Sequence, residues 1–219
     1  MNLIINNTKI SKVSSCKYLG VHIDEFLSWD VHIEYIYKKL IKFTSLFYKV
    51  RNILPTACLH KLYFAFVHPH ILYGIEVYAN TCKTKLDKLM KLNNKLIRIL
   101  LNKKWLTPVK ELYIELDVLP IPLLHEMKIL DLIHKCLYEK QLVPDVFRNY
   151  FIEKNSVHSH NTRRGKNLFL RSVSSNFGKR NTAFHGSKTW NCLPENFKLC
   201  SSNILFKKLI KKYLMDRIC

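Results

Sequence analysis

Apolar side chains recur at intervals of three and four residues through one long segment, and this spacing limits the folds open to the chain. The series is Ile33, Ile36, Leu40, Phe43, Phe47 and Val50. Residues at these intervals share one face of a helix, and such a face is buried against other elements. Only 5 Gly and 7 Pro occur in 219 residues, which disfavours a turn-rich sandwich or barrel. The sequence therefore predicts a mainly α fold.

Similar spacing predicts further helices along the chain. They are expected at 56–69, with Pro69 kinking or breaking the helix, and at 84–102, 109–115, 123–139 and 204–215. Residues 1–27 instead alternate polar and apolar side chains, which predicts a short β element of two or three strands. Ser28 or Asp30 can cap the helix that follows. Residues 143–198 are expected to be less regular.

Charge is the second strong signal. Lys and Arg number 36 against 16 Asp and Glu, a formal net charge of +20. Like charges repel in a compact state, and a polyanionic partner relieves that repulsion when Lys and Arg displace counterions from phosphates. The composition therefore favours RNA, DNA or an RNA–DNA hybrid as partner. A merely basic, solvated surface is the alternative.

The helix expected at 84–102 carries a basic stripe. Lys88, Lys91, Lys95 and Arg98 recur at helical spacing, with Lys85 near the edge of the stripe. The opposite face is mostly apolar. We read the stripe as unrelieved by any acid, so that a phosphate backbone along the helix would offset the repulsion. An ordinary solvated face is the competing interpretation.

A second basic cluster lies in the irregular region. Its predicted binding residues are Arg163, Arg164, Lys166, Lys179 and Arg180. Glycines among them suit a loop that follows a phosphate chain. Three aromatic residues interleave with this cluster and either stack on bases or anchor the loop to the core: Phe169, Phe177 and Phe184.

Several functions are disfavoured by what the sequence lacks. The seven Cys are odd in number and form no C-x-x-C pair, which argues against a disulfide framework or a standard zinc site. We expect reduced thiols in the nucleus or cytoplasm, and no secretion signal. The apolar run 62–75 is shorter than the ~20 residues of a membrane-spanning helix, so we expect no membrane association.

Catalytic residues are not predicted. Two-metal polymerase chemistry needs closely placed carboxylates, and the sequence has no Asp-Asp pair. Asp24, Glu25 and Asp30 have ordinary roles at a strand-to-helix junction. His68 and His70 could form a metal pair, but a kinked core segment explains them better. We therefore expect no catalytic site, no metal site and no cofactor in this chain.

Two early motifs resemble the end of the palm in non-LTR (LINE-type) retrotransposon reverse transcriptases, where K-Y-L-G-V-x-I/L-D precedes an L-S-W helix start. The matching residues are Lys17-Tyr18-Leu19-Gly20-Val21-His22-Ile23-Asp24, then Leu27-Ser28-Trp29 and His32-Ile33. The family's thumb pattern resembles Leu62-Tyr63, Pro69, Leu72-Tyr73-Gly74 and Val77-Tyr78. Its next helix resembles Leu92-Asn93-Asn94-Lys95 with Ile97-Arg98.

Later motifs extend the resemblance over nearly the whole chain. Post-thumb helices of the family match Leu112-Tyr113, Leu116 and Leu119-Pro120. Its arginine-rich tail and W-N-x-L-P signature resemble Arg163-Arg164 and Phe184-His185-Gly186-Ser187-Lys188-Thr189-Trp190-Asn191-Cys192-Leu193-Pro194. Each motif is short, and their shared order and spacing make the resemblance specific.

The resemblance implies a division of the chain and a role. It makes 1–27 the end-of-palm β element, 28–104 a thumb-like helical bundle, 105–142 the post-thumb helices, and 143–219 a basic loop region with a C-terminal helix. A thumb would grip template–primer RNA/DNA through the phosphate backbone. The missing palm and fingers of a parent enzyme would be a further partner.

The departures from the family concern catalysis. The family's metal-binding Asp residues, its fingers and any endonuclease lie upstream of the matched region, and the Cys/His knuckle of some members is absent. Mg²⁺ and polymerase activity are thus implied only for an intact parent, and Met1 fits an internal start in a truncated copy. Two alternatives stay open: a domesticated, non-enzymatic protein that binds nucleic acid or an acidic protein, and a pseudogene product without function.

Overall fold

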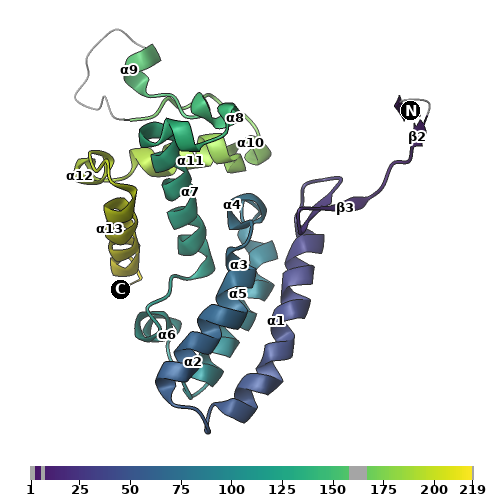
Figure 1. The fold of residues 1–219 in the computed structure, drawn as a ribbon, viewed down its shortest axis with the longest axis vertical. Coiled ribbons are helices and arrows are strands. Elements are labelled where there is room, and N and C mark those ends of the chain that lie inside the picture. Colours follow the sequence, from purple (N-terminus) through teal and green to yellow (C-terminus); the bar gives the residue numbers. More distant parts are fainter. Residues whose placement is uncertain (1–2, 6–7, 158–166, 219) are drawn as a thin grey trace.

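Two β hairpins begin the chain, and helices make up most of the rest (Figure 1). The computed structural model describes residues 3–5, 8–157 and 167–218. Strand β1 (Leu3–Ile5) pairs with β2 (Thr8–Ile10), and β3 (Ser15–Tyr18) pairs with β4 (Val21–Asp24), both antiparallel. The mainly α prediction with a short N-terminal β element is confirmed, although the element holds four short strands rather than two or three.

Three long helical segments follow side by side. Helix α1 spans Asp30–Val50, and α5 spans Lys83–Leu100. Ion pairs join Asp30 to Lys85 and Glu34 to Lys88, so α1 and α5 run in parallel. The segment between them returns in the opposite direction (Figure 1). The expected stripe of α1 is confirmed, because Ile33, Ile36, Leu40 and Phe47 are buried and Phe43 and Val50 are partly buried.

Pro69 does not break the returning segment, which stays helical through a change of helix type. Helix α2 (Thr56–Leu62) passes into a π-helical turn, η1 (Tyr63–Val67), before α3 (His68–Leu72). Proline lacks an N–H and its ring crowds the preceding turn. The wider turn relieves that crowding, and the His68 N–H reaches back to the Tyr63 carbonyl. A short helix, α4 (Ile75–Tyr78), then leads to α5.

The C-terminal half is organised around α7 (Ile121–Tyr138), which packs against α4, α11 (Thr182–Asn191) and α13 (Asn203–Asp216). Helix α6 (Val109–Glu115) connects α5 to α7. The remaining helices are short: η2 (Lys140–Leu142), α8 (Asp145–Arg148), α9 (Lys154–Val157), α10 (Asn176–Arg180) and α12 (Glu195–Lys198).

Helix α11 lies in the region expected to be irregular. Its Gly186 suggests a loop in the sequence, yet it marks a close approach of two helices. A Cβ at Gly186 would lie 3.0 Å from Ile129 Cγ2 and 3.1 Å from Ile133 Cδ1, both on α7. The absence of a side chain therefore lets α11 pack directly on α7.

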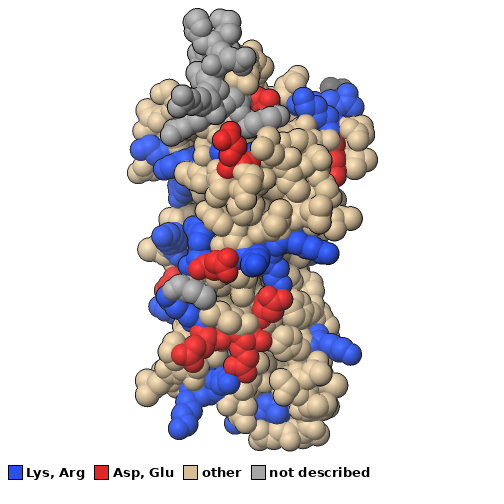
Figure 2. All heavy atoms as spheres, turned by 90° about the vertical axis from the view of Figure 1, so that its left-hand side faces the viewer, with Lys and Arg blue, Asp and Glu red and all other residues tan. Residues whose placement is uncertain are grey.

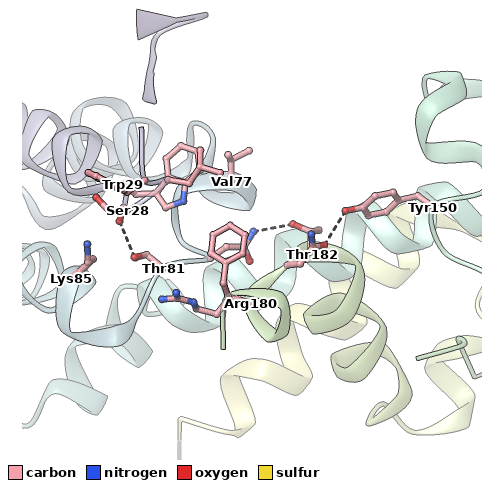
Figure 3. A pocket seen from close by; sticks show the side chains of 13 residues that line it. Ser28, Trp29, Val77, Thr81, Lys85, Tyr150, Arg180 and Thr182 are labelled. Carbon is pink, nitrogen blue, oxygen red and sulfur yellow. Dashed lines mark hydrogen bonds between the residues drawn. The ribbon is translucent and has the colours of Figure 1, made fainter. Parts of the chain in front are cut away.

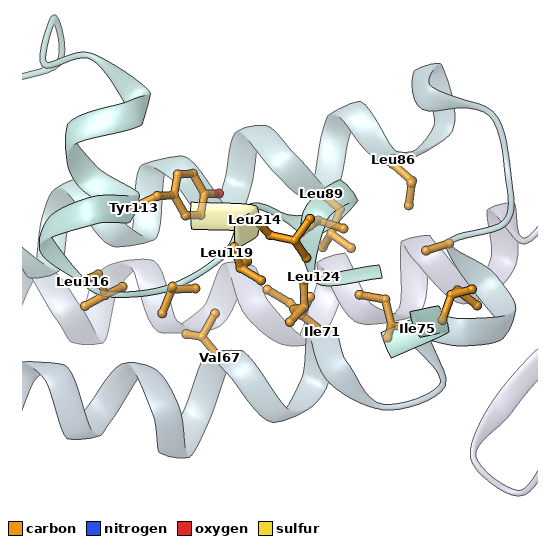
Figure 4. Close-up of a cluster of buried hydrophobic side chains, with 14 of the residues drawn as sticks. Val67, Ile71, Ile75, Leu86, Leu89, Tyr113, Leu116, Leu119, Leu124 and Leu214 are labelled. Carbon is orange, nitrogen blue, oxygen red and sulfur yellow. The ribbon is translucent and has the colours of Figure 1, made fainter. Parts of the chain in front are cut away.

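One hydrophobic core joins the first helices to the last (Figure 4). Side chains from α3, α5, α6 and α7 meet there, together with Leu214 from α13. The C-terminal helices are thus fixed relative to the α1–α5 pair. Among the described helices, none combines the length and the apolar character that crossing a membrane requires.

Candidate nucleic-acid interface

Helix α5 has the two faces that its sequence predicts. Lys88, Lys91 and Lys95 are exposed, while Lys85 and Arg98 are partly buried. The opposite face is buried and consists of Leu86, Leu89, Asn93, Leu96, Ile97 and Leu100. The basic side chains therefore lie along the solvent side of a helix anchored by its apolar side.

Acids reach three of these cations, so the expectation of an unrelieved stripe is wrong. Lys85 Nζ lies 2.5 Å from Asp30 Oδ2, and Lys88 Nζ lies 2.6 Å from Glu34 Oε2. Asp87, one turn earlier on α5 itself, pairs with Lys91 at 2.6 Å. The hydrogen bond from Lys88 lowers the pKa of Glu34. Two of the acids come from α1, more than fifty residues away in the chain.

Arg98 has structural contacts of its own. Its Nη2 donates to the Thr107 carbonyl at 3.1 Å, and its guanidinium lies 5.4 Å from the Trp105 ring centroid. These contacts fasten the connection between α5 and α6. If Arg98 binds a phosphate, its guanidinium must do so while it also holds this connection.

Beyond the ion pairs, the parallel register of α1 and α5 creates a basic surface across both helices. Lys38 and Lys42 follow Glu34 by one and two turns on α1, and the register places them beside the turn of α5 that carries Lys95. No Asp or Glu follows Glu34 on α1 or Asp87 on α5.

We call Lys38, Lys42 and Lys95 the basic face. All three are exposed, and none has an ion-pair partner among the residues that the structure describes. Sequence reasoning missed the two lysines of α1. Their spacing from each other was visible, but the register of α1 against α5 was not.

The second predicted cluster is described only in part. Arg163, Arg164 and Lys166 lie outside the described residues. Lys179 is exposed on α10, whereas Arg180 is partly buried and lines a pocket of about 320 Å³ (Figure 3). Lys85 lines the same pocket. The structure thus brings together one residue from each predicted basic cluster.

The pocket lies between four parts of the chain: the turn before α1, the connection from α4 to α5, the segment after α8 that carries Tyr150, and the α10–α11 region (Figure 3). Hydrogen bonds hold these parts together. Asn80 Nδ2 donates to Thr182 Oγ1 at 2.9 Å, and Thr81 Oγ1 donates to the Ser28 carbonyl at 3.0 Å. Tyr150 Oη donates to Asn181 Oδ1 at 3.2 Å.

The wall before α1 is built by Asp24. Its Oδ1 accepts from the backbone N–H of Ser28 at 2.9 Å, and its Oδ2 accepts from that of Trp29 at 2.8 Å. Leu27 and Trp29 have φ values of 50° and 67°, in the left-handed region, which costs about 1–3 kcal/mol for each such residue. Burial alone would raise the pKa of Asp24, but the backbone N–H donors lower it. Asp24 therefore holds this turn. Trp29, the N-cap residue of α1, makes no side-chain cap bond itself, but the Ser28 hydroxyl accepts from the N–H of Asp30, the first residue of α1, at 3.4 Å.

Two family-like motifs touch each other directly. Gly20 and Gly74 have φ values of +81° and +69°, and both are closely approached. A Cβ on Gly20 would lie 3.3 Å from the Tyr73 ring, and Tyr73 Oη donates to the Leu19 carbonyl at 2.5 Å. The β3–β4 turn therefore packs on the end of α3, which gives the Leu-Gly and Tyr-Gly motifs a structural role.

Two other motifs support the fold through polar contacts. Asn191 follows the buried Trp190, accepts from the Leu168 N–H at 2.7 Å and donates to its carbonyl at 2.9 Å. Buried Asn93 accepts from Tyr63 Oη at 3.1 Å and donates to Tyr113 Oη at 3.0 Å. These contacts tie segments that are far apart in the chain to one another.

Other predicted features also have structural surroundings. The ring of His68 lies among Tyr63 and Phe64, and that of His70 lies beside Phe43. Within the described ranges, no group of three His, Cys, Asp or Glu residues could hold a metal ion. Phe169 and Phe184 line a separate small pocket, whereas Phe177 lines the pocket of Lys85 and Arg180.

Comparison with curated proteins identifies relatives. The chain is 28% identical over 117 residues to the RNA-directed DNA polymerase from mobile element jockey of Drosophila funebris. It is 26% identical over 117 residues to the polymerase of the same name from Drosophila melanogaster. Each alignment covers 52% of this chain and 13% of the relative. This chain is similar to part of a retrotransposon reverse transcriptase.

The relationship confirms the resemblance to LINE-type reverse transcriptases that the motifs indicated. The matched part spans far less than two thirds of the length of these relatives. No family model and no solved structure matches the chain. The activity of the whole relatives therefore bears on this chain only as a proposal.

Proposed function

We propose that this chain is a C-terminal piece of a retrotransposon RNA-directed DNA polymerase that holds template–primer RNA/DNA by its phosphate backbone. Residues 28–104 would act as the thumb-like bundle and 105–142 as the post-thumb helices. The basic face of Lys38, Lys42 and Lys95 carries this proposal. It is an exposed cluster of cations, without ion-pair partners among the described residues, on two helices that a shared core fixes in parallel.

The geometry of the basic face suits a phosphate chain rather than a single anion. Lys38 and Lys42 lie one turn apart, with about 5–6 Å between their Cβ atoms. Lys95 adds a cation from the neighbouring helix. Flexible ammonium groups in such an array can each contact a different phosphate and release counterions. Recognition of this kind follows the shape and backbone of a duplex and carries no sequence information.

Duplex binding by a triple variant tests the proposal. Lys38→Gln, Lys42→Gln and Lys95→Gln together should weaken binding of a blunt RNA–DNA hybrid, measured by fluorescence anisotropy across a salt series. The slope of log K against log salt should become shallower by about 0.7–0.9 for each phosphate that the variant no longer neutralises. Unrelated duplex sequences should lose affinity equally. Glutamine keeps helix propensity, so α1 and α5 should stay intact.

The matched control carries the same charge change elsewhere. Lys140→Gln, Lys208→Gln and Lys212→Gln replace three exposed lysines of η2 and α13. This control should keep most of the duplex affinity and the original salt slope. Equal losses in both variants would mean that only net charge matters, and the proposal would fail.

We further propose that the chain alone does not extend a primer and that it acts in the nucleus or cytoplasm. Support comes from the lack of an Asp-Asp pair and from six described cysteines that are free thiols. Mg²⁺ chemistry would belong to an intact parent, with its palm and fingers. Reproducible primer extension that follows the purified chain in the presence of Mg²⁺ and dNTPs would contradict this proposal.

A further inference from the structure

The pocket of Lys85 and Arg180 has aromatic walls that face solvent. Phe26 is 78% exposed and Phe177 is 55% exposed, and they come from segments far apart in the sequence. Trp29 and Tyr150 complete the aromatic lining. Single exposed aromatic residues are common, but two that converge on one pocket provide planar surfaces for a flat ligand. Every nucleic-acid base has such a face, and stacking tolerates any sequence.

The same pocket has a cationic side. Arg180 has no ion-pair partner among the described residues, and its buried Nε has no hydrogen-bond partner there. Lys85 is held by Asp30, but no Asp or Glu is among the described residues that line the pocket. In Figure 3 the guanidinium of Arg180 extends toward the side of Thr81 and Lys85. An arginine in this setting can bind phosphate through its planar donors.

The turn that carries Phe26 and Trp29 is held in one conformation. Asp24 accepts the N–H groups of Phe26, Ser28 and Trp29 while Leu27 and Trp29 keep left-handed backbone angles. A turn fixed at this conformational cost presents its aromatic residues in a constant arrangement. Such fixed strain is frequent at ligand sites.

The position of the pocket relates it to the basic face. Lys85 begins the solvent side of α5 and Lys95 lies ten residues later on the same helix, about 15 Å along its axis. We propose that the pocket binds one unpaired nucleotide of a strand whose duplex part lies on the basic face. The base would stack between Phe26 and Phe177, and its phosphate would contact Arg180. This inference deepens the proposed function and rests on it.

The test compares two ligands for the full chain: a blunt RNA–DNA hybrid and the same hybrid with a short single-stranded RNA overhang. The overhang should raise affinity on the order of tenfold, as expected for one stacked base. Phe177→Ala and Phe177→Leu should both remove this gain and leave binding of the blunt hybrid unchanged. Phe177 is exposed on a short helix, so neither substitution should alter thermal stability much.

Further arms separate the base from the phosphate. An abasic overhang should lose most of the gain, and Arg180→Lys should reduce the part that remains. A DNA overhang of the same sequence shows whether the sugar matters. Leu199→Ala, which changes an exposed apolar side chain outside the pocket, should keep the full gain.

The failures of the two proposals are distinguishable. If the wild-type chain binds the blunt hybrid with a steep salt dependence but gains nothing from the overhang, the pocket proposal is overturned and the basic face stands. If Phe177→Ala weakens blunt and overhang ligands equally, the pocket proposal is also overturned. If the blunt hybrid does not bind, the proposed function fails. The pocket proposal is then tested with single-stranded RNA alone, and it is overturned if Phe177→Ala binds this RNA as tightly as the wild-type chain does.

Discussion

Helices α5 and α13 are both basic and amphipathic, yet their cations have different surroundings. On α13, Lys207 Nζ lies 3.4 Å from Asp131 Oδ2, and Lys211 Nζ lies 2.5 Å from Asp117 Oδ2. Arg217, just after α13, pairs with Glu126 at 2.5 Å. Figure 2 shows this side of the molecule, where acidic and basic side chains are interspersed. On α5, Lys85, Lys88 and Lys91 are paired too, but no acid follows Glu34 on α1 or Asp87 on α5.

The difference lies in the neighbouring segments. Residues 107–150 contain seven acids and five basic residues, and they supply the carboxylates that pair with α13. Helix α1 supplies only Asp30 and Glu34 to α5 and then continues with lysines. The charge pattern of a helix predicts which side faces solvent. Its packing partner decides whether those charges are available to a ligand.

We expect the largest effect from a substitution that disrupts the packing of α1 against α5. Leu40 is fully buried in the core, and Leu40→Ala should destabilise the fold by about 2–5 kcal/mol through lost burial and a residual cavity. Urea unfolding followed by circular dichroism measures the change. Leu46→Ala, at a 42% exposed position of the same helix, should cost less than about 1 kcal/mol. Equal costs would show that the packed face of α1 is misassigned.

The next largest effect is a loss of stability at low pH, to which one buried histidine in each half of the molecule contributes. Burial lowers the pKa of His32 in α1 to about 4, with His22 and Lys39 adding to the shift. Burial also lowers the pKa of His125 in α7 to about 4, with His185 adding to it. Because both folded-state values lie below the ordinary 6.5, the unfolded chain binds more protons as pH falls. The stabilisation is complete above pH 6.5 and is lost between pH 6.5 and 4.

Each histidine should therefore cost about 2 kcal/mol of stability between roughly pH 7.5 and pH 5. Urea unfolding at the two pH values measures the loss. His32→Gln and His125→Gln should each flatten the pH dependence, whatever they do to stability at neutral pH. The carboxyl of Asp24 should contribute only at lower pH, because its depressed pKa preserves its charge until pH falls below the ordinary 3.8. A wild-type chain equally stable at both pH values would contradict the buried, neutral state of these rings.

Smaller effects are expected from the loss of one acid in each of two helix pairs, Asp131 between α7 and α13 and Asp30 between α1 and α5. Asp131 is buried, accepts from Asn203 at 2.9 Å and pairs with Lys135 and Lys207. Asp131→Asn should cost about 1–3 kcal/mol, because a buried charged acceptor is removed. Asp30→Asn removes an exposed pair with Lys85 and should cost at most about 1 kcal/mol. Thermal denaturation of both variants ranks the two sites, and a reversed order would mean that the α13 pairs are superficial.

Much of the helical fold could be predicted from local patterns. The ends of α1 and α6 follow directly from apolar spacing and from prolines. Helix α11 could not be predicted, because Gly186 resembles a loop residue until α7 is known to pack against it. The spacing of apolar residues predicts which face of a helix is buried, but it does not predict which helix packs against that face.

The candidate site shows the same limit. The amphipathic character of α5 was visible in the sequence, and so was the cluster around Lys179 and Arg180. The pairing of Lys88 with Glu34 and the meeting of Arg180 with Lys85 depend on contacts between residues far apart in the chain. Such contacts arise from the register of packed helices, which a single sequence does not specify.

The smallest expected effect tests whether the acids of α1 mask cations of α5. Glu34→Gln removes the carboxylate that holds Lys88 and keeps the length of the side chain. Lys88, about two turns before Lys95, would then extend the basic face toward the start of α5. Affinity for a blunt RNA–DNA hybrid should rise a few-fold, and the salt slope should steepen by up to about 0.9 for the additional phosphate that Lys88 neutralises.

Glu195→Gln gives the same change in net charge at an exposed position of α12, where the residue has no ion-pair partner among the described residues. A rise in affinity from Glu34→Gln alone would show that local masking, rather than total charge, separates α5 from α13. An equal rise in both variants would attribute the gain to net charge. No rise in either would mean that Lys88 stays away from the bound nucleic acid, and the basic face would end at Lys38, Lys42 and Lys95.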